Sequence, residues 1–144
     1  MRLTAYTDYS LRLLMYAALK DPELVTIQEV ADIYGISRNH LMKVAFQLRR
    51  HGFLETVRGR GGGLRLARKP DKIGLGEIIR ATEEDFTMVE CFNPATNSCA
   101  IIKPCRLRGV LGRALNAYLA VLDEYTLADL TARHPALARV LAVA

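Results

Sequence analysis

Apolar side chains recur at helical spacing near the start of the chain and predict two helices. The first covers residues 5–19, with Thr4 in position to cap it. The second covers residues 27–34, where Thr26 and Glu29 have the spacing of a capping box. In that motif each side chain accepts a hydrogen bond from the other residue's backbone amide, so the start of the second helix is sharply defined.

A third amphipathic segment follows after a turn of three residues that begins with Gly35. Ser37 stands at its predicted N-cap, and the helix ends near Gly52. Its inward-facing residues are Leu41, Val44, Ala45 and Leu48. Two helices joined by a short glycine-containing turn predict a helix-turn-helix unit.

Two short runs of strand-forming residues, 53–57 and 64–67, follow the third helix. The sequence RGRGGG between them carries Arg58 and Arg60 among four glycines, which predicts a flexible, cationic hairpin tip. No Lys-Ser/Thr pair follows, so the glycines do not form a P-loop. The pattern predicts a mainly α fold, with a winged helix-turn-helix domain over residues 1–84 whose wing is a small β-hairpin.

Charge is distributed unevenly along the chain. Residues 1–72 carry 13 Lys and Arg against 7 Asp and Glu, whereas residues 73–144 carry 7 against 8. Within residues 37–69 the counts are 9 and 1. A local excess of this size indicates a polyanionic partner, most economically nucleic acid. An amphipathic surface helix with a solvated basic face is the structural alternative.

The exposed face of the third helix has the chemistry that reads base edges in the major groove of duplex DNA. Arginine and asparagine bind guanine and adenine through paired hydrogen bonds, and the first residues of a recognition helix enter the groove. Arginines on a glycine-rich wing favour a narrow minor groove. The candidate DNA-binding residues are Ser37, Arg38, Asn39, His40, Lys43, Gln47, Arg50, Arg58 and Arg60.

All the cysteines lie within residues 85–105, where two prolines and several asparagines indicate an irregular loop. Cys91, Cys99 and Cys105 are separated by seven and five residues, so no CxxC pair exists. Thiolates are the ligands that iron-sulfur clusters select, and zinc binding or thiol oxidation stays open. The N-terminus lacks a signal peptide and no long apolar run occurs, so we expect a cytoplasmic protein without membrane partners or a structural disulfide.

Two further helices are predicted, over residues 75–84 and 106–126. The second is long and carries more apolar surface than a domain of this size needs, which indicates a second copy as its cover. A two-fold dimer would place two recognition helices roughly 34 Å apart and predicts a palindromic operator. Residues 106–144 are thus expected to form a dimerisation helix and a helical tail interrupted by Pro135. The candidate interface residues are Leu107, Leu111, Ala114, Leu115, Tyr118, Leu122 and Tyr125.

Three groups of motifs occur in the same order as in the iron-sulfur winged-helix regulators that include IscR and RirA. They are the opening LTAYTDYSLRLLMY, the block VADIYGISRNHLMKV with the wing VRGRGGGLRLA, and three cysteines before a long helix. The chain resembles this family over nearly its whole length. The segments YGISRNHLMK, CRL and LDEYTLADL are most similar to its nitric-oxide-sensing repressors.

The resemblance implies a non-enzymatic homodimer with one [4Fe-4S] or [2Fe-2S] cluster per protomer, held by Cys91, Cys99 and Cys105. It also implies a fourth ligand from the first helix of the partner protomer, and Asp8 matches that position. Within its own helix, Asp8 also suits the positive end of the dipole, and Arg12 at i+4 is placed to orient or neutralise the carboxylate. IscR-like proteins carry a histidine ligand three residues after the last cysteine, where this chain has Arg108.

The resemblance therefore implies a transcriptional repressor that senses nitric oxide, with nitrosylation of the cluster lowering its affinity for an operator. A regulator of the same architecture that responds to iron or cluster status is the nearer alternative. A thiol-redox or zinc-stabilised winged-helix regulator is the second. An enzyme that uses the three thiols lacks a Cys/His pair at catalytic spacing and leaves the basic wing unexplained.

Overall fold

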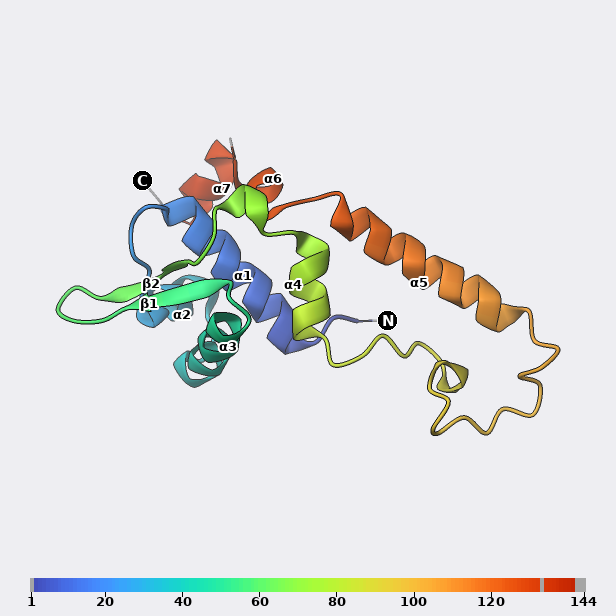
Figure 1. Cartoon of the computed structure of the whole chain (residues 1–144). Helices are drawn as coiled ribbons and strands as arrows, with labels where there is room; N and C mark the ends of the chain where they lie inside the picture. Colours follow the sequence, from blue (N-terminus) through green and yellow to red (C-terminus); the bar gives the residue numbers. More distant parts are fainter. Residues whose placement is uncertain (1, 133, 142–144) are drawn as a thin grey trace.

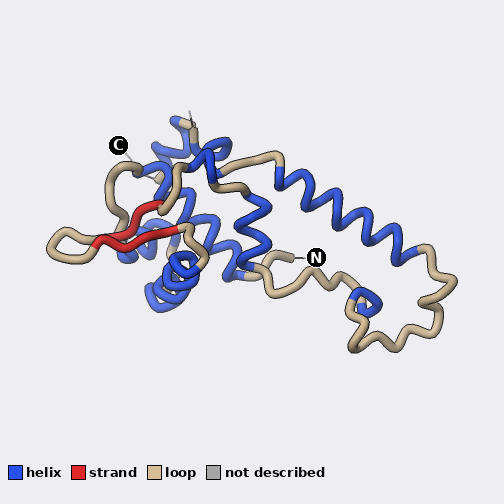
Figure 2. Tube along the Cα trace, in the orientation of Figure 1, coloured by secondary structure: helices blue, strands red, loops and turns tan. Residues whose placement is uncertain are grey.

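The computed structural model describes residues 2–132 and 134–141. Its first half consists of α1 (Ala5–Lys20), α2 (Ile27–Tyr34) and α3 (Arg38–Arg50), followed by β1 (Leu54–Val57) and β2 (Gly63–Leu66). The strands pair antiparallel, with Leu54 opposite Leu66 and Val57 opposite Gly63. Figures 1 and 2 show α1 at the centre, α3 below it and the hairpin extending to one side. The predicted winged helix-turn-helix fold is confirmed.

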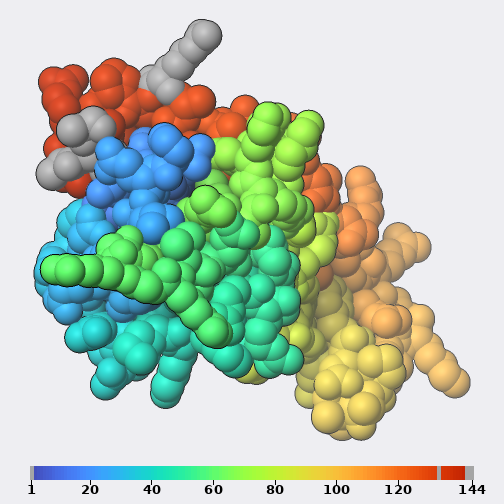
Figure 3. All heavy atoms as spheres, turned by 60° about the vertical axis from the view of Figure 1, so that its left-hand side comes forward, coloured from blue at the N-terminus to red at the C-terminus, as the bar shows by residue number. Residues whose placement is uncertain are grey.

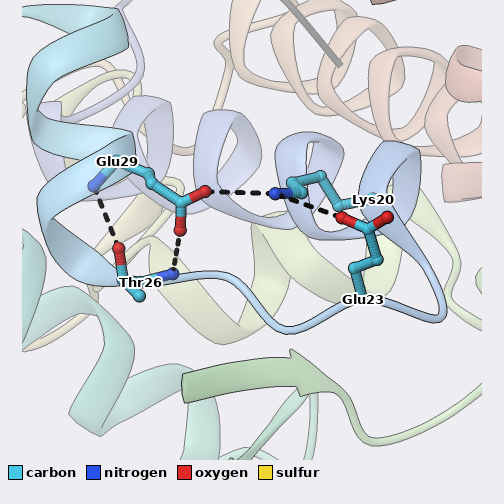
Figure 4. A network of polar contacts seen from close by, with 4 residues as sticks. All are labelled: Lys20, Glu23, Thr26 and Glu29. Atoms are coloured by element: carbon cyan, nitrogen blue, oxygen red, sulfur yellow. Dashed lines mark hydrogen bonds and ion pairs between the residues drawn. The ribbon is translucent and has the colours of Figure 1, made fainter. Parts of the chain in front are cut away.

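The start of α2 is fixed by the predicted capping box. Thr26 Oγ1 accepts a hydrogen bond from the Glu29 amide at 3.2 Å, and Glu29 Oε2 accepts one from the Thr26 amide at 2.7 Å. Lys20, at the end of α1, reaches the same carboxylate at 3.1 Å and Glu23 at 3.4 Å (Figure 4). Burial raises the pKa of Glu29, but hydrogen bonds from Thr26 and Lys20 outweigh it and hold that pKa below its ordinary value. One carboxylate therefore joins α1 to α2.

The core surrounds α1, which packs against α3, α4, β2 and α6. The four residues expected to face inward on α3 are all buried. The largest fully buried side chains come mainly from α1, α3, β1, α4 and α6 and the loops between elements, and include Leu13, Leu14, Leu41, Leu48, Phe53, Leu54, Ile73, Ile78 and Leu127. Burying each such side chain contributes about 1.5–3 kcal/mol, so the helix-turn-helix is held by its packing on α1.

The second half begins with a 3₁₀ turn, η1 (Pro70–Lys72), and α4 (Leu75–Thr82). A long irregular segment containing η2 (Glu90–Phe92) then leads to α5 (Leu107–Asp123), which begins far from the winged-helix core and runs back to it (Figure 1). Arg80 on α4 holds the end of α5 by donating to both carboxylate oxygens of Asp123, at 2.6 and 2.7 Å. None of the described helices has the length and apolarity of a membrane span.

The C-terminal segment returns to the core through α6 (Leu127–Thr131) and α7 (Pro135–Val140). The Leu127 amide donates to the Ile73 carbonyl at 2.8 Å, and the Leu75 amide donates to Tyr125 at 2.9 Å. Leu127 and Leu141 are both buried. The tail expected after the long helix therefore completes the core of the N-terminal domain. Part of that tail, at residues 133 and 142–144, lies outside the described residues.

Candidate DNA-reading face and thiol loop

The exposed side of α3 carries the residues expected to contact DNA. Ser37, Arg38, Asn39, His40, Lys43 and Arg50 are exposed, and Gln47 is half-buried. Within the described residues, no carboxylate forms an ion pair with the cations of this set, whereas the nearby Arg65 and Arg68 pair with Glu55 and Glu77. Unpaired cations on one surface are free to bind phosphates. We call this surface, with Arg58 and Arg60, the DNA-reading face.

The N-terminus of α3 is also open. Ser37 occupies the N-cap position, as predicted, but its side chain makes no capping hydrogen bond. The first amides of a helix lack partners within the helix and carry a partial positive charge, so they bind phosphate readily. Ser37 and these amides therefore add donors to the DNA-reading face.

The wing requires its glycines. Gly59 and Gly61 have φ angles of 105° and 77°, in the left-handed region that glycine favours. A side chain at Gly62 or Gly63 would overlap the backbone carbonyl of Val57 or Val25. The tight tip leaves Arg58 and Arg60 exposed. In Figure 3 the green hairpin and the teal side chains of α3 lie next to each other on one face of the molecule.

Asp8 lies beside two contacts that join α1 to the helix-turn-helix, one made by Arg12 and one by Tyr9. Arg12 donates to both of its carboxylate oxygens, with Nη2 at 2.7 Å and Nε at 3.0 Å. The same guanidinium lies 5.8 Å above the ring of Tyr34, the last residue of α2. Burial raises the pKa of Tyr34, and the charge of Arg12 opposes that increase. Next to Asp8, the Tyr9 ring lies 6.4 Å from the ring of His40 on α3.

The thiol loop, residues 85–105, is largely irregular, as expected (Figure 2). Its cysteines are free and half-buried. Glu90 Oε1 accepts hydrogen bonds from the amide and hydroxyl of Ser98, at 3.2 and 3.3 Å. Glu90 directly precedes Cys91, and Ser98 directly precedes Cys99. The contact therefore brings the backbone next to Cys91 close to the backbone next to Cys99. Glu90 and Ser98 were not among the expected site residues, and their only signal in the sequence is that each directly precedes a cysteine.

The third cysteine lies beside the start of α5. Cys105 lines an open hollow of about 550 Å³ with Lys103 and Arg108. The first turn of α5 contains no acidic residue and its N-cap makes no side-chain hydrogen bond, so the positive end of the helix is uncompensated. Within the described residues, however, no three His, Cys, Asp or Glu side chains are grouped closely enough to hold a metal ion. The single protomer does not assemble the expected ligand set.

The apolar surface of α5 is divided between two sides. Leu115 and Tyr118 line a hollow of about 420 Å³ with Glu83 and Phe86, and Leu122 packs against the core of its own protomer. The adjoining side, about 100° around the helix, is exposed, and no residue of α5 is buried. Leu107, Val110, Ala114, Ala117, Val121 and, just beyond the helix, Tyr125 are exposed. The expected interface set therefore spans both sides, because Leu107, Ala114 and Tyr125 are exposed, whereas Leu111, Leu115, Tyr118 and Leu122 are half-buried.

Curated relatives are similar over almost the whole chain. The HTH-type transcriptional regulator NsrR of Bacillus licheniformis is 55% identical over 131 residues, covering 90% of this chain and 92% of that protein. NsrR of Bacillus subtilis is also 55% identical over 131 residues, covering 90% of each chain. These matches confirm the resemblance to NsrR-type regulators that the sequence indicated.

Solved structures show the same architecture. CymR, the global cysteine regulator of B. subtilis, matches with a TM-score of 0.76 at 26% identity, covering 91% of this chain and 96% of that one. The T. potens IscR structure matches with a TM-score of 0.71 at 25% identity, covering 90% and 85%. The Rrf2 family model, described as an iron-dependent transcriptional regulator, matches residues 3–133. The chain therefore belongs to the Rrf2 family and is a DNA-binding transcriptional regulator.

Proposed function

We propose that the chain is a homodimeric repressor that senses nitric oxide through an iron-sulfur cluster held by its thiol loop. The observation that carries this proposal is the position of the loop. It joins α4, part of the winged-helix core, to α5, whose exposed apolar side suits a second copy. A chemical change in the loop is therefore placed between the DNA-reading face and the dimer interface.

The donor types suit such a cluster, although the three thiols are not grouped within the described residues. Cys91, Cys99 and Cys105 are free thiols on one irregular loop, and such a loop is able to wrap a cluster. Lys103, Arg108 and the start of α5 place positive charge beside Cys105, which suits the net negative charge of a cluster with thiolate ligands. When bound, the cluster supplies iron that reacts with nitric oxide.

A fourth ligand comes from the second protomer in this proposal. Asp8 of the same protomer is not grouped with the thiols, and its side chain is 44% exposed, so it is accessible to another chain. The exposed side of α5 provides the surface that brings two protomers together. We assign the fourth position to the partner's Asp8, a hard oxygen ligand that gives a labile site on thiolate-bound iron.

The chain's own contacts then connect this site to DNA. If Asp8 served as a ligand, at least one of its two carboxylate oxygens would leave Arg12, and the guanidinium that lies over Tyr34 would be freer to move. Tyr34 ends α2 directly before the Gly35 turn, and Tyr9 lies against His40 of α3. The state of Asp8 thereby biases the placement of the recognition helix. Coupling of about 1–3 kcal/mol between two such sites changes affinity roughly 5- to 150-fold.

Regulation by iron or cluster status is the second candidate. It is favoured by the family model's description and by the structural likeness to T. potens IscR. Both candidates use the same ligands, so they differ only in the signal. A chelator would act as strongly as nitric oxide on a status regulator, whereas a nitric oxide sensor would respond to nitric oxide at constant iron supply.

The test is anaerobic reconstitution with iron and sulfide, followed by absorption spectroscopy and iron and sulfide assays. The wild type is expected to hold iron and sulfide, and Cys91→Ser, Cys99→Ser and Cys105→Ser to lose them. Thr96→Ala is the matched control, because it changes an exposed residue of the thiol loop without removing a thiol. Retention of a full cluster in the three cysteine variants would refute the ligand assignment.

A further inference from the structure

Two large apolar side chains lie on the exposed side of the recognition helix. Met42 is 52% exposed and Phe46 is 51% exposed, although the core-facing residues of α3 are almost completely buried. The two are four residues apart, so they lie one turn above the other on the same side of the helix. We call this pair the apolar strip. Neither residue was among the expected DNA-binding residues.

The apolar strip continues the DNA-reading face. Arg38 precedes it by four residues and Arg50 follows it by four, so a cation stands one turn away at each end. Asn39 and Lys43 are exposed on the adjoining side of the helix. No acidic residue occurs in α3, whose sequence is RNHLMKVAFQLRR. The strip is therefore an apolar interval within a basic, hydrogen-bonding surface.

A small hollow adjoins the strip on the side of the wing. It has a volume of about 190 Å³ and lies between Met42 and Phe46 of α3, Ile27 of α2 and the hairpin residues Thr56 and Leu64. The Arg49 guanidinium lies 5.8 Å from the centre of the Phe46 ring. The hollow is lined mainly by apolar atoms and opens beside the cations that bind phosphate. A ligand that fits this hollow and the neighbouring cations carries a small apolar group on a polyanionic backbone.

Duplex DNA offers such a group. In the major groove, the 5-methyl of thymine is the apolar feature that base pairs present, and side chains such as phenylalanine recognise it. We propose that Met42 and Phe46 contact a thymine methyl group in each operator half-site and so help to specify the sequence. This inference rests on DNA binding through α3 and adds the base that the apolar strip reads.

The test begins with duplexes selected by the full-length protein from a random-sequence pool. Each thymine of a selected duplex is replaced in turn by uracil, which removes the methyl group and keeps base pairing. Affinity is measured by fluorescence anisotropy for the wild type, Met42→Ala, Phe46→Ala and Val140→Ala. Val140 is the control because it is 82% exposed on α7, outside the DNA-reading face.

We expect uracil at one position of each half-site to weaken wild-type binding about fourfold, the equivalent of the roughly 0.8 kcal/mol gained by burying one methyl group. Phe46→Ala or Met42→Ala should bind more weakly and lose this dependence on the methyl group, and Val140→Ala should behave as the wild type. The inference is overturned if no thymine-to-uracil replacement weakens wild-type binding. It is also overturned if the replacement weakens binding by Met42→Ala and Phe46→Ala as much as it weakens wild-type binding. Failure to select any duplex would contradict DNA binding itself.

Discussion

Val110 offers a direct test of the proposed dimer. It lies in the first turns of α5 and is 59% exposed, with Leu107, Ala114 and Val121 on the same side. Val110→Asp places a carboxylate on this apolar side. A negative charge near a helix N-terminus does not oppose the helix dipole, so α5 should keep its structure. Any loss of association is then due to the surface and not to unfolding.

The expected loss of dimer stability follows from the exposed fraction of the Val110 side chain. Full burial of a valine contributes about 1.5–3 kcal/mol, so covering the 59% of Val110 that is exposed contributes roughly 1–2 kcal/mol in each protomer. A two-fold interface buries the side chain twice. The variant also places two carboxylates without partners in an apolar seam, which costs several kcal/mol more unless water reaches them. We expect dimer dissociation to become at least about 100-fold easier.

Sedimentation equilibrium over a range of protein concentrations measures this change. Asn116→Asp is the matched control, because it adds the same charge at an exposed polar position of α5. The control should dimerise as the wild type does, and binding to a two-half-site duplex should weaken only in Val110→Asp. If Val110→Asp dimerises like the wild type, the exposed side of α5 is not the interface.

Three further outcomes are expected. Thr26→Ala removes the cap of α2 and should lower the free energy of unfolding by about 1 kcal/mol in urea titrations, whereas Thr87→Ala, whose side chain is exposed in the thiol loop, should change it little. Arg58→Ala and Arg60→Ala should each reduce the slope of log affinity against log salt by about 0.9 if each arginine contacts one phosphate, and an unchanged slope would exclude the wing from the interface. The hydrogen bond from Arg80 lowers the pKa of Asp123, so the stabilisation from this pair is present above the ordinary aspartate pKa and is lost as the pH falls through the lowered one. NMR titration should show the Asp123 pKa rising towards its ordinary value in Arg80→Gln; no change would mean that the pair does not form in solution.

Local signals in the sequence predicted the helix-turn-helix well. The capping box of Thr26 and Glu29 and the Gly35 turn depend on residues within a few positions of each other, and both occur as expected. The Asp8–Arg12 pair has the same origin, because residues four apart on a helix are neighbours. Features set by short spacing could therefore be predicted from the sequence.

Features set by tertiary contact could not be predicted in this way. The apolar arc of α5 is wide, and the side that turns towards its own protomer is set by tertiary contacts such as the packing of Leu122 and the pairing of Arg80 with Asp123. Likewise, Leu127 and Leu141 could be recognised as core residues only once the tail was seen to return to α1. Met42 and Phe46 look like ordinary core residues by composition, and their exposure emerged from the packing of α3.

Release of DNA by nitric oxide through the thiol loop can be measured in a single titration. Reconstituted protein is bound anaerobically to a labelled, selected duplex, and nitric oxide is added while anisotropy and absorption are recorded on the same sample. We expect the affinity for DNA to fall roughly 5- to 150-fold as the absorption changes. In Cys99→Ser, nitric oxide should leave affinity unchanged. A wild-type affinity that stays constant while the absorption changes would show that the cluster does not control DNA binding.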